Sequence, residues 1–402
     1  MIDTTNFTCG NEQVAVPMPG ISRPLLWLMA MAAGIGIANM YYNQPLLDQM
    51  RETYGADAQS VGWVPTLTQF GYALGMLFLV PLGDMFQRKR LVIIFAGLSS
   101  IGALAIALAP SLSMLVSISF LFGLANMTPQ LLVPFAAYLA APYEKGRVVG
   151  FMVSFMLLGI LLARTVAGFV GTALGWRAMF GLSAAAMAAM AIALARALPQ
   201  SEPTHRGHYF GLLATVWKLL REQPVLREAC VFGAMLFGSF MLFWSSLIHL
   251  MEGPQFEAGP RVVGLYGLLG AAAALGSPLI GALADKTSPR RLTGVLIALA
   301  IGSYGIFYWG QASLIWVGIG VLLMDIGVQL GHVTNQGRIF RLVPEAHSRI
   351  QTAYMFFYFT GASLGSALGA WAWSHYGWGG VCLAAVAMLS VAFVRWLLPA
   401  PD

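Results

Sequence analysis

The sequence predicts an all-α membrane protein with 12 transmembrane helices, arranged as two pseudo-symmetric six-helix bundles. Three observations lead to this fold class. The 402 residues are 58% hydrophobic and only 9% charged, whereas a typical soluble domain carries roughly 25% charged residues. Apolar stretches of about 20 residues, the length that crosses a bilayer, recur along the chain. The motifs of the first half return in the same order in the second half.

Twelve apolar stretches are long enough to be transmembrane helices. They cover residues 24–47, 60–82, 90–109, 112–140, 148–171, 177–198, 228–250, 263–284, 291–310, 313–337, 350–373 and 378–398. Of the 22 Lys and Arg residues, 18 fall on one side of these spans, three fall on the other, and Arg164 lies inside a span. Positive residues gather on the cytoplasmic side, so both termini are predicted to be cytoplasmic, with the protein in the cell inner membrane. This topology accounts for the net charge of +6 without a nucleic-acid partner.

The longest connection, residues 199–227, divides the chain into the two predicted bundles. Residues 1–23 are expected to form a cytoplasmic N-terminal segment, residues 24–198 the first bundle, residues 228–398 the second bundle, and residues 399–402 a short tail. Within the connection, the stretch GLLATVWKLLREQ is amphipathic and predicts a short helix at the membrane surface.

The two halves repeat the same motifs at a nearly constant distance. The pairs are Pro142 and Pro344, Arg147 and Arg349, GWRAMF at 175–180 and GWGGVC at 377–382, and Asp84 and Asp285. The first three pairs lie 202 residues apart and the last pair 201. Duplicated six-helix halves are typical of secondary transporters, whose binding site lies near the middle of the membrane between the halves.

Several of these motifs resemble the major facilitator superfamily, and the resemblance covers nearly the whole chain. VPLGDMFQRKR is similar to the family's signature loop between spans two and three, and GALADKTSPRR is its second copy. NMYYNQPLL at 39–47 and LLMDIGVQLGHVTNQ at 322–336 resemble a bacterial branch of drug/proton-antiporter-like members. The resemblance implies transport by alternating access and a conformational latch that holds the outward-open state. The latch residues would be Asp84, Arg88, Lys89, Asp285, Lys286 and Arg290.

The stretch GILLARTVAG, residues 159–168, places Arg164 within the fifth span, where antiporter members of the family carry proline. At 1.5 Å per residue its depth is about 21 Å. Exposure to lipid at this depth costs about 3 kcal/mol or more, so the side chain should face protein or a water-filled cavity. Arginine stays protonated and cannot carry a coupling proton. Arg164 therefore holds an anionic substrate group, biases the proton affinity of a nearby acid, or acts as a structural clamp.

The tenth span carries one acid near the middle of the membrane and a stripe of polar residues. Asp325, Gln329, His332 and Gln336 are spaced i, i+4, i+7 and i+11, so they share one helix face, with Asn335 beside them. Burial favours the protonated form of a carboxyl group. Asp325 is therefore the predicted proton-coupling residue, and His332 a second candidate for proton transfer or substrate contact. The alternative for each is a satisfied structural group.

In the family, spans one, four, seven and ten line a central cavity. The cavity residues predicted on this basis are Asn39, Tyr42, Asn43, Asn126, Gln130, Trp244, Gln329, Asn335 and Gln336. The sequence contains no nucleophile elbow, P-loop or zinc-protease motif, and its three cysteines lack metal-ligand spacing. No enzyme activity, cofactor or metal is therefore expected.

The leading hypothesis is a proton-coupled transporter that exports small amphipathic or drug-like compounds. Its expected partners are a small-molecule substrate, protons and the lipid bilayer, and it is expected to be a monomer. Two alternatives stay open. The chain could be an organic-anion or metabolite carrier that uses Arg164 as an anion contact, or a membrane receptor that senses a ligand without moving it.

Overall fold

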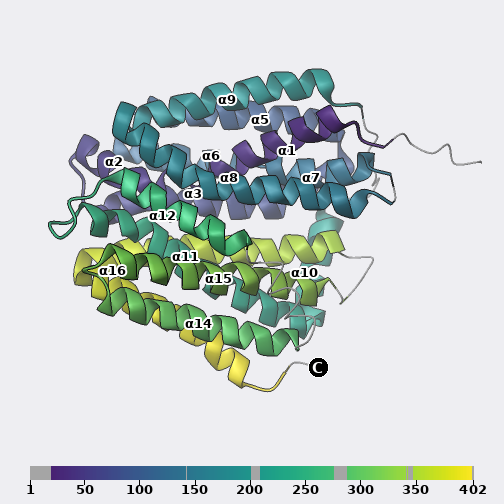
Figure 1. Ribbon diagram of the computed structural model, residues 1–402. Helices are drawn as coiled ribbons and strands as arrows, with labels where there is room; N and C mark the ends of the chain where they lie inside the picture. Colours follow the sequence, from purple (N-terminus) through teal and green to yellow (C-terminus); the bar gives the residue numbers. More distant parts are fainter. Residues whose placement is uncertain are drawn as a thin grey trace, which may run out of the picture.

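The computed structural model describes residues 20–141, 143–200, 209–275, 288–340, 342 and 347–400. This part of the chain is predominantly helical and contains no β-strand. Its helices lie side by side in two bundles, with most helices of the first half on one side and most helices of the second half on the other (Figure 1). The all-α prediction is therefore confirmed, while the count of 12 spans and the side of the termini remain predictions.

The first half consists of α1 (Arg23–Ala38), η1 (Gln44–Leu46), α2 (Leu47–Tyr54), α3 (Ala58–Phe78), α4 (Leu82–Met85), α5 (Arg88–Ala107), α6 (Leu112–Ala125), α7 (Thr128–Leu139), α8 (Lys145–Leu174) and α9 (Trp176–Ala197). The second half consists of α11 (Pro224–Glu252), α12 (Pro260–Leu275), α14 (Pro289–Trp309), α15 (Leu314–Ile339) and α16 (His347–Leu397). The linker helix α10 (Tyr209–Glu222) lies between the two halves in sequence. Eight segments of the described chain are long and apolar enough to cross a membrane, and α1 is a shorter apolar helix.

The predicted first span, 24–47, is not one helix. The structure ends α1 at Ala38, and the chain makes turns before η1 and α2. Pro45 prevents a regular helix from continuing through residues 41–45, because proline lacks an N–H group and its ring clashes with the carbonyl four residues earlier. The predicted cavity residues Asn39, Tyr42 and Asn43 therefore lie on a turn segment instead of a helix face.

The predicted fourth span is also divided, into α6 and α7, at Asn126 and Met127. A break in a membrane helix must have its free backbone groups satisfied by neighbours. Asn126 is fully buried and its side chain supplies one such contact, donating from Nδ2 to the backbone oxygen of Gly36 on α1 at 2.7 Å. Its Oδ1 accepts a hydrogen bond from Ser99 of α5 at 3.2 Å. The break is thus tied to two helices of its own bundle.

The two bundles meet along a seam that is tightest at the end carrying α2 and the α11–α12 connection, here called the α2 end. Thr165 of α8 donates to the backbone oxygen of Gly264 on α12 at 2.7 Å. Ser363 of α16 donates to the backbone oxygen of Thr66 on α3 at 2.9 Å. A methyl group on Gly62 would clash with Ala370, because α3 and α16 are in close contact there.

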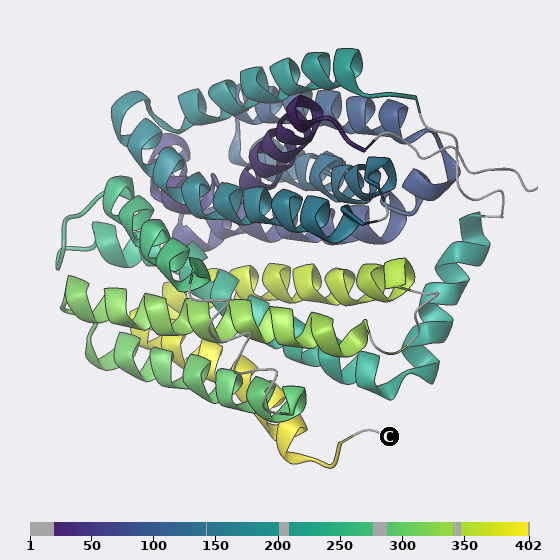
Figure 2. The same ribbon diagram turned by 45° about the vertical axis from the view of Figure 1, so that its right-hand side comes forward.

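At the opposite end, the α10 end, the linker helix runs along the edge of the second bundle from about the level of the seam (Figure 2). Tyr209 donates from its hydroxyl to the backbone oxygen of Phe78 at the end of α3, at 2.6 Å. A cavity of about 200 Å³ lies between α10, α3 and α16. Its lining includes Val216 and Leu220 of α10, Phe78 of α3 and Phe356 of α16. The linker helix α10 therefore packs on the second bundle and reaches the first bundle at the end of α3.

Candidate functional site

Arg164 lies in the seam between the bundles and is held mainly by aromatic rings. Its guanidinium carbon is 4.1 Å from the ring centre of Trp244 on α11, 5.0 Å from that of Tyr41 and 5.3 Å from that of Phe240. Its Nε donates to Oε1 of Gln44 in η1 at 2.7 Å. The side chain is 1% exposed, and its Nη2 has no hydrogen-bond partner in the part of the chain that the structure describes. The arginine is therefore stabilised by cation–π contacts and keeps a free donor.

The position of Arg164 follows from the small residues around it on α8. A methyl group on Gly159 would clash with the backbone oxygen of Gly34 on α1, and one on Gly168 with the backbone oxygen of Pro260 on α12. Glycine at these points lets the helix backbones approach closely. The helix α8 is thereby fixed against both bundles, and the residue between these two contacts points into the seam.

Asp325 of α15 is 1% exposed, and its Oδ2 is buried without a hydrogen-bond partner among the described residues. Its charge and that of Arg164 are close enough to affect each other, yet between these two described residues no ion pair closes within 4 Å. Within the same described ranges, the buried groups Asn43 Oδ1, Gln69 Oε1 and Trp244 Nε1 also lack partners. The first half contributes Arg164 and Gln44 to this group, and the second half contributes Trp244 and Asp325.

A second polar group lies further toward the α10 end on α15. Nδ1 of His332 is 3.1 Å from the hydroxyl oxygen of Tyr354, and its ring centre is 4.5 Å from that of Tyr358. Asn335 is fully buried and accepts a hydrogen bond from Arg338 at 3.5 Å. The stripe predicted on α15 is therefore divided, with Asp325 near Arg164 and His332 among tyrosines of α16.

The remaining predicted cavity residues differ in their surroundings. Asn39 is 1% exposed and accepts a hydrogen bond from Ser183 at 2.6 Å. Gln130 is half-buried and donates to the hydroxyl of Tyr72 at 2.9 Å. Asn43 donates to Thr68 at 3.5 Å, and Asn126 braces the α6–α7 break. The structure therefore ties these four side chains into the first bundle.

Tyr42, Gln329 and Gln336 complete the predicted set. Tyr42 is buried on the turn before η1, and the two glutamines are half-buried on α15. Gln329 and Gln336 have partly exposed side chains on the same helix as Asp325, so they remain available to a ligand.

The predicted latch is described in part. Arg88 donates to the backbone oxygen of Gly83 at 3.2 Å and lies over the ring of Tyr138. Lys89 donates to the backbone oxygen of Leu198 at 2.6 Å. The side chain of Asp84, and Asp285 and Lys286 as a whole, lie outside the described residues.

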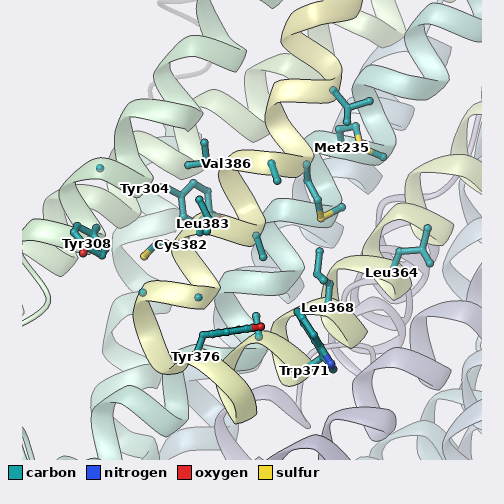
Figure 3. A pocket seen from close by; sticks show the side chains of 18 residues that line it. Met235, Tyr304, Tyr308, Leu364, Leu368, Trp371, Tyr376, Cys382, Leu383 and Val386 are labelled. Carbon is teal, nitrogen blue, oxygen red and sulfur yellow. The ribbon is translucent and has the colours of Figure 1, made fainter.

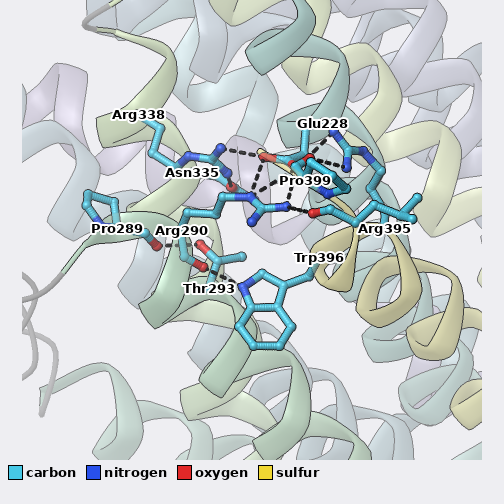
Figure 4. A network of polar contacts seen from close by, with 10 residues as sticks. Glu228, Pro289, Arg290, Thr293, Asn335, Arg338, Arg395, Trp396 and Pro399 are labelled. Carbon is cyan, nitrogen blue, oxygen red and sulfur yellow. Dashed lines mark hydrogen bonds and ion pairs between the residues drawn. The ribbon is translucent and has the colours of Figure 1, made fainter. Parts of the chain in front are cut away.

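Arg290, the remaining latch candidate, belongs to a network that sequence reasoning missed. Its partner is Glu228, whose side chain is fully buried and also contacts Arg338 at 2.5 Å and Arg395 at 3.2 Å (Figure 4). One carboxylate thus joins arginines from α14, α15 and α16 to α11. Glu228 was missed because it directly follows Arg227 at the start of an apolar stretch, where it resembles an ordinary end-of-span charge.

A large cavity of about 1190 Å³ lies away from the seam. It is lined by α14, α16 and one residue of α11, Met235, and includes Trp371, Tyr376 and Leu383 (Figure 3). Leu383 is 71% exposed, so this groove opens to the outer face of the second bundle. Its lining is mostly apolar and includes none of the polar groups described at the seam.

Sequence reasoning also missed Tyr41, Gln44 and Gln69. Tyr41 and Gln44 contact Arg164, and both glutamines contact Met241 across the seam. Gln44 and Gln69 both donate toward the sulfur of Met241, at 3.2 and 3.7 Å. The available signal was NMYYNQPLL, in which polar residues cluster inside an apolar span. The break in that span could have pointed to Gln44.

Comparisons with known proteins agree with this architecture. The sequence profile described as Major Facilitator Superfamily matches residues 26–365. The chain is 41% identical over 380 residues to the putative uncharacterized transporter YgaY of Escherichia coli (strain K12), covering 94% of this chain and 96% of the relative. A more distant relative is the purine ribonucleoside efflux pump NepI of Escherichia coli O127:H6, 24% identical over 292 residues and 69% of each chain.

Among solved structures, the fold is similar to that of a bacterial homolog to the human lysosomal transporter Spinster in an inward-facing and unoccupied conformation. The TM-score is 0.75 at 15% sequence identity, covering 94% of this chain and 97% of the other. At this identity the likeness concerns the fold alone.

Proposed function

The chain belongs to the major facilitator superfamily and is a secondary transporter, not an enzyme, and from this premise we propose that it exports small amphipathic compounds in exchange for protons. The two bundles rock about the seam, which exposes the polar groups around Arg164 to one side of the membrane at a time. The protein acts as a monomer in the bacterial inner membrane. Its ligands are protons and a largely uncharged organic substrate.

The observation that carries this proposal is the buried, unpartnered carboxyl oxygen of Asp325 near the permanently charged Arg164. A protonated Asp325 is neutral and tolerates burial, whereas an ionised Asp325 is stabilised by approach to Arg164. Gain and loss of one proton therefore changes the charge balance of the seam. Such a change is what couples proton movement to rocking of the bundles.

The direction of transport rests on two supporting arguments. The α2 end, which the positive-residue bias assigns to the outer side, is where the bundles are in tight contact. With this end closed, the polar groups of the seam are reached from the cytoplasmic side, which is the side from which an exporter takes up its substrate. The name of the relative NepI, an efflux pump, also supports export.

Proteoliposomes with an imposed pH gradient test the proposal. Asp325→Asn cannot exchange a proton, so gradient-driven substrate movement should fall by about tenfold or more, while exchange of substrate without a gradient continues. Asp325→Glu is the matched control, because it keeps a titratable carboxyl group. Undiminished gradient-driven transport by Asp325→Asn would show that the coupling proton binds elsewhere.

A second candidate function is favoured by the free Nη2 of Arg164, which is buried and unpartnered. A carboxylate or phosphate on the substrate would satisfy this donor, because a guanidinium group can bind such an anion through two parallel N–H···O hydrogen bonds. The protein would then be an organic-anion carrier. Arg164→Gln should abolish transport of an anionic test compound while sparing a neutral one. Equal loss for both compounds would favour the structural role of Arg164.

A further inference from the structure

A cluster of ionisable side chains joins the two halves at the α2 end. Its α11 members follow Trp244 by five and eight residues. The seam cluster consists of Asp48 and Arg51 of α2 and His249 and Glu252 of α11. These four residues line a pocket of about 460 Å³ together with Asp57 and Trp373. The proposed proton-coupling site at Asp325 uses none of them.

Asp48 is the centre of the seam cluster. Its side chain is 7% exposed, and its Oδ1 is 3.6 Å from Nδ1 of His249, whose side chain is 4% exposed. Arg51 contacts both carboxylate oxygens of Asp48, one of them at 3.1 Å. The contact between Asp48 and His249 crosses the seam, so it is present only while the α2 end is closed.

Glu252 lines the same pocket as Asp48, and the two carboxyl groups are close enough to affect each other's ionisation. Two carboxyl groups can share a hydrogen bond only when one of them carries a proton, because two carboxylates offer acceptors alone. Burial opposes ionisation of Asp48, but its contacts with His249, Arg51 and Glu252 outweigh it and hold the pKa of Asp48 well below its usual range. Asp48 is therefore the ionised partner, and a proton shared by the pair resides on Glu252.

From this geometry we propose that Glu252 and Asp48 form a second proton-binding site, which keeps the α2 end closed while it is occupied. Loss of the proton places two carboxylates against each other in a partly enclosed pocket, and their repulsion favours separation of α2 from α11. The other charged groups that face the pair are Arg51, Glu52, Asp57 and His249. The neighbouring residues of α16, Trp373 and Ser374, line the pocket without adding an ionisable group.

This site gives the transporter a role for protons apart from the central carboxyl group. Acid on the side of the α2 end closes that end, and alkali opens it. The inference rests on alternating access, but it does not depend on which residue carries the coupling proton.

A distance measurement across the α2 end tests the inference. The full-length protein, with its native cysteines replaced by alanine, receives spin labels at Gln59→Cys and Gln255→Cys, which are exposed and lie in different halves. In lipid nanodiscs, the ratio of short to long distances should fall as the pH rises from about 5 to about 9, by up to about tenfold per pH unit for one proton. A ratio that is constant across this range would overturn the inference.

Matched variants locate the proton. Glu252→Gln keeps a hydrogen-bond donor to Asp48 but cannot ionise, so the short distance should persist at every pH. Asp48→Asn removes one of the two opposed charges and should also flatten the pH profile, which provides a second test if the first variant folds poorly. Glu257→Gln, at an exposed position after α11 that does not line the pocket, should retain the profile of the unmodified protein. An unchanged profile in both Glu252→Gln and Asp48→Asn contradicts the inference.

The Asp325→Asn variant separates this inference from the proposed function. It should lose gradient-driven transport yet retain the pH-dependent distance at the α2 end. If Asp325→Asn abolishes the pH dependence of that distance, the titrating group is the central acid and the second site is refuted. If the distance titrates while Asp325→Asn transports normally, the proposed coupling residue is wrong and the second site stands.

Discussion

At the scale of single residues, the charged groups of this protein are held in two contrasting ways. Arg164 is surrounded by aromatic rings and has one hydrogen bond to a side chain, from Nε to Gln44. Glu228 is surrounded by three arginines and has no exposed side-chain area. The first arrangement leaves one guanidinium donor without a partner among the described residues, whereas the second pairs its charges within the protein.

Removing the Glu228 charge should destabilise the second bundle. Glu228→Gln leaves Arg290, Arg338 and Arg395 close together without their shared carboxylate, and breaking a buried ion pair in this way costs about 3 kcal/mol. The melting temperature of the purified protein should fall clearly. Glu222→Gln is the control, since the Glu222–Lys218 pair is solvent-exposed and such pairs contribute little. Equal melting temperatures for both variants would contradict the role given to Glu228.

The ring of Trp244 should matter more than its N–H group. Trp244→Phe keeps an aromatic face for Arg164, whereas Trp244→Leu keeps only apolar volume, and a desolvated cation–π contact is worth about 2 kcal/mol. Transport activity and melting temperature should therefore fall further in Trp244→Leu. If both variants lose the same activity, the unpartnered indole Nε1 is the group that counts.

At the scale of helices, the sequence predicted most elements but not the places where they break. Apolar length alone located α3, α5, α8, α9 and α11, because lipid selects for uninterrupted helices of that length. The end of α1 at Ala38 was missed because Asn39, Asn43 and Gln44 are too few to lower the average hydropathy of the 24–47 stretch. The contacts of Arg164 could not be predicted either, because Trp244 is distant in sequence and only the packing of α8 against the second half brings it near.

The contact of α8 with α12 should control closure of the α2 end. Gly168→Val places a branched side chain against the backbone of Pro260 and Gly264. The closed seam should therefore be disfavoured, and the fraction of molecules with the long distance between spin labels at positions 59 and 255 should rise. Gly150→Val is the matched control on the same helix, because no atom lies within 4 Å of a methyl group there. A closed α2 end in Gly168→Val would show that α8 and α12 separate more easily than their contact suggests.

At the scale of the whole molecule, two bundles in contact at one end imply that transport requires that end to open. Thr66 on α3 and Ser363 on α16 are in contact, since the hydroxyl of Ser363 donates to the backbone oxygen of Thr66 at 2.9 Å, so a pair of cysteines at these positions lies within reach of a disulfide bond. The double variant Thr66→Cys and Ser363→Cys should cross-link under mild oxidation and lose transport, and a reducing agent should restore activity. The pair Thr66→Cys and Trp371→Cys should not cross-link, because Trp371 lines the groove on the outer face.

Retained transport in the cross-linked protein would mean that substrate passes without separation of α3 from α16. In that case the bundles would not rock as two bodies, and movement of individual helices would have to admit the substrate. The seam cluster would then regulate a smaller motion than the one proposed.

The helix α10 is attached near both of its ends. Tyr209 bonds to the end of α3 in the first half, while Arg227 at the start of α11 caps the last carbonyls of α10, those of Leu220 and Arg221. Its fixed length of 14 residues therefore works as a tether that limits how wide the substrate entrance can become. Lengthening or shortening α10 by whole turns should therefore change the size of the largest compound admitted without altering the surroundings of Arg164 and Asp325.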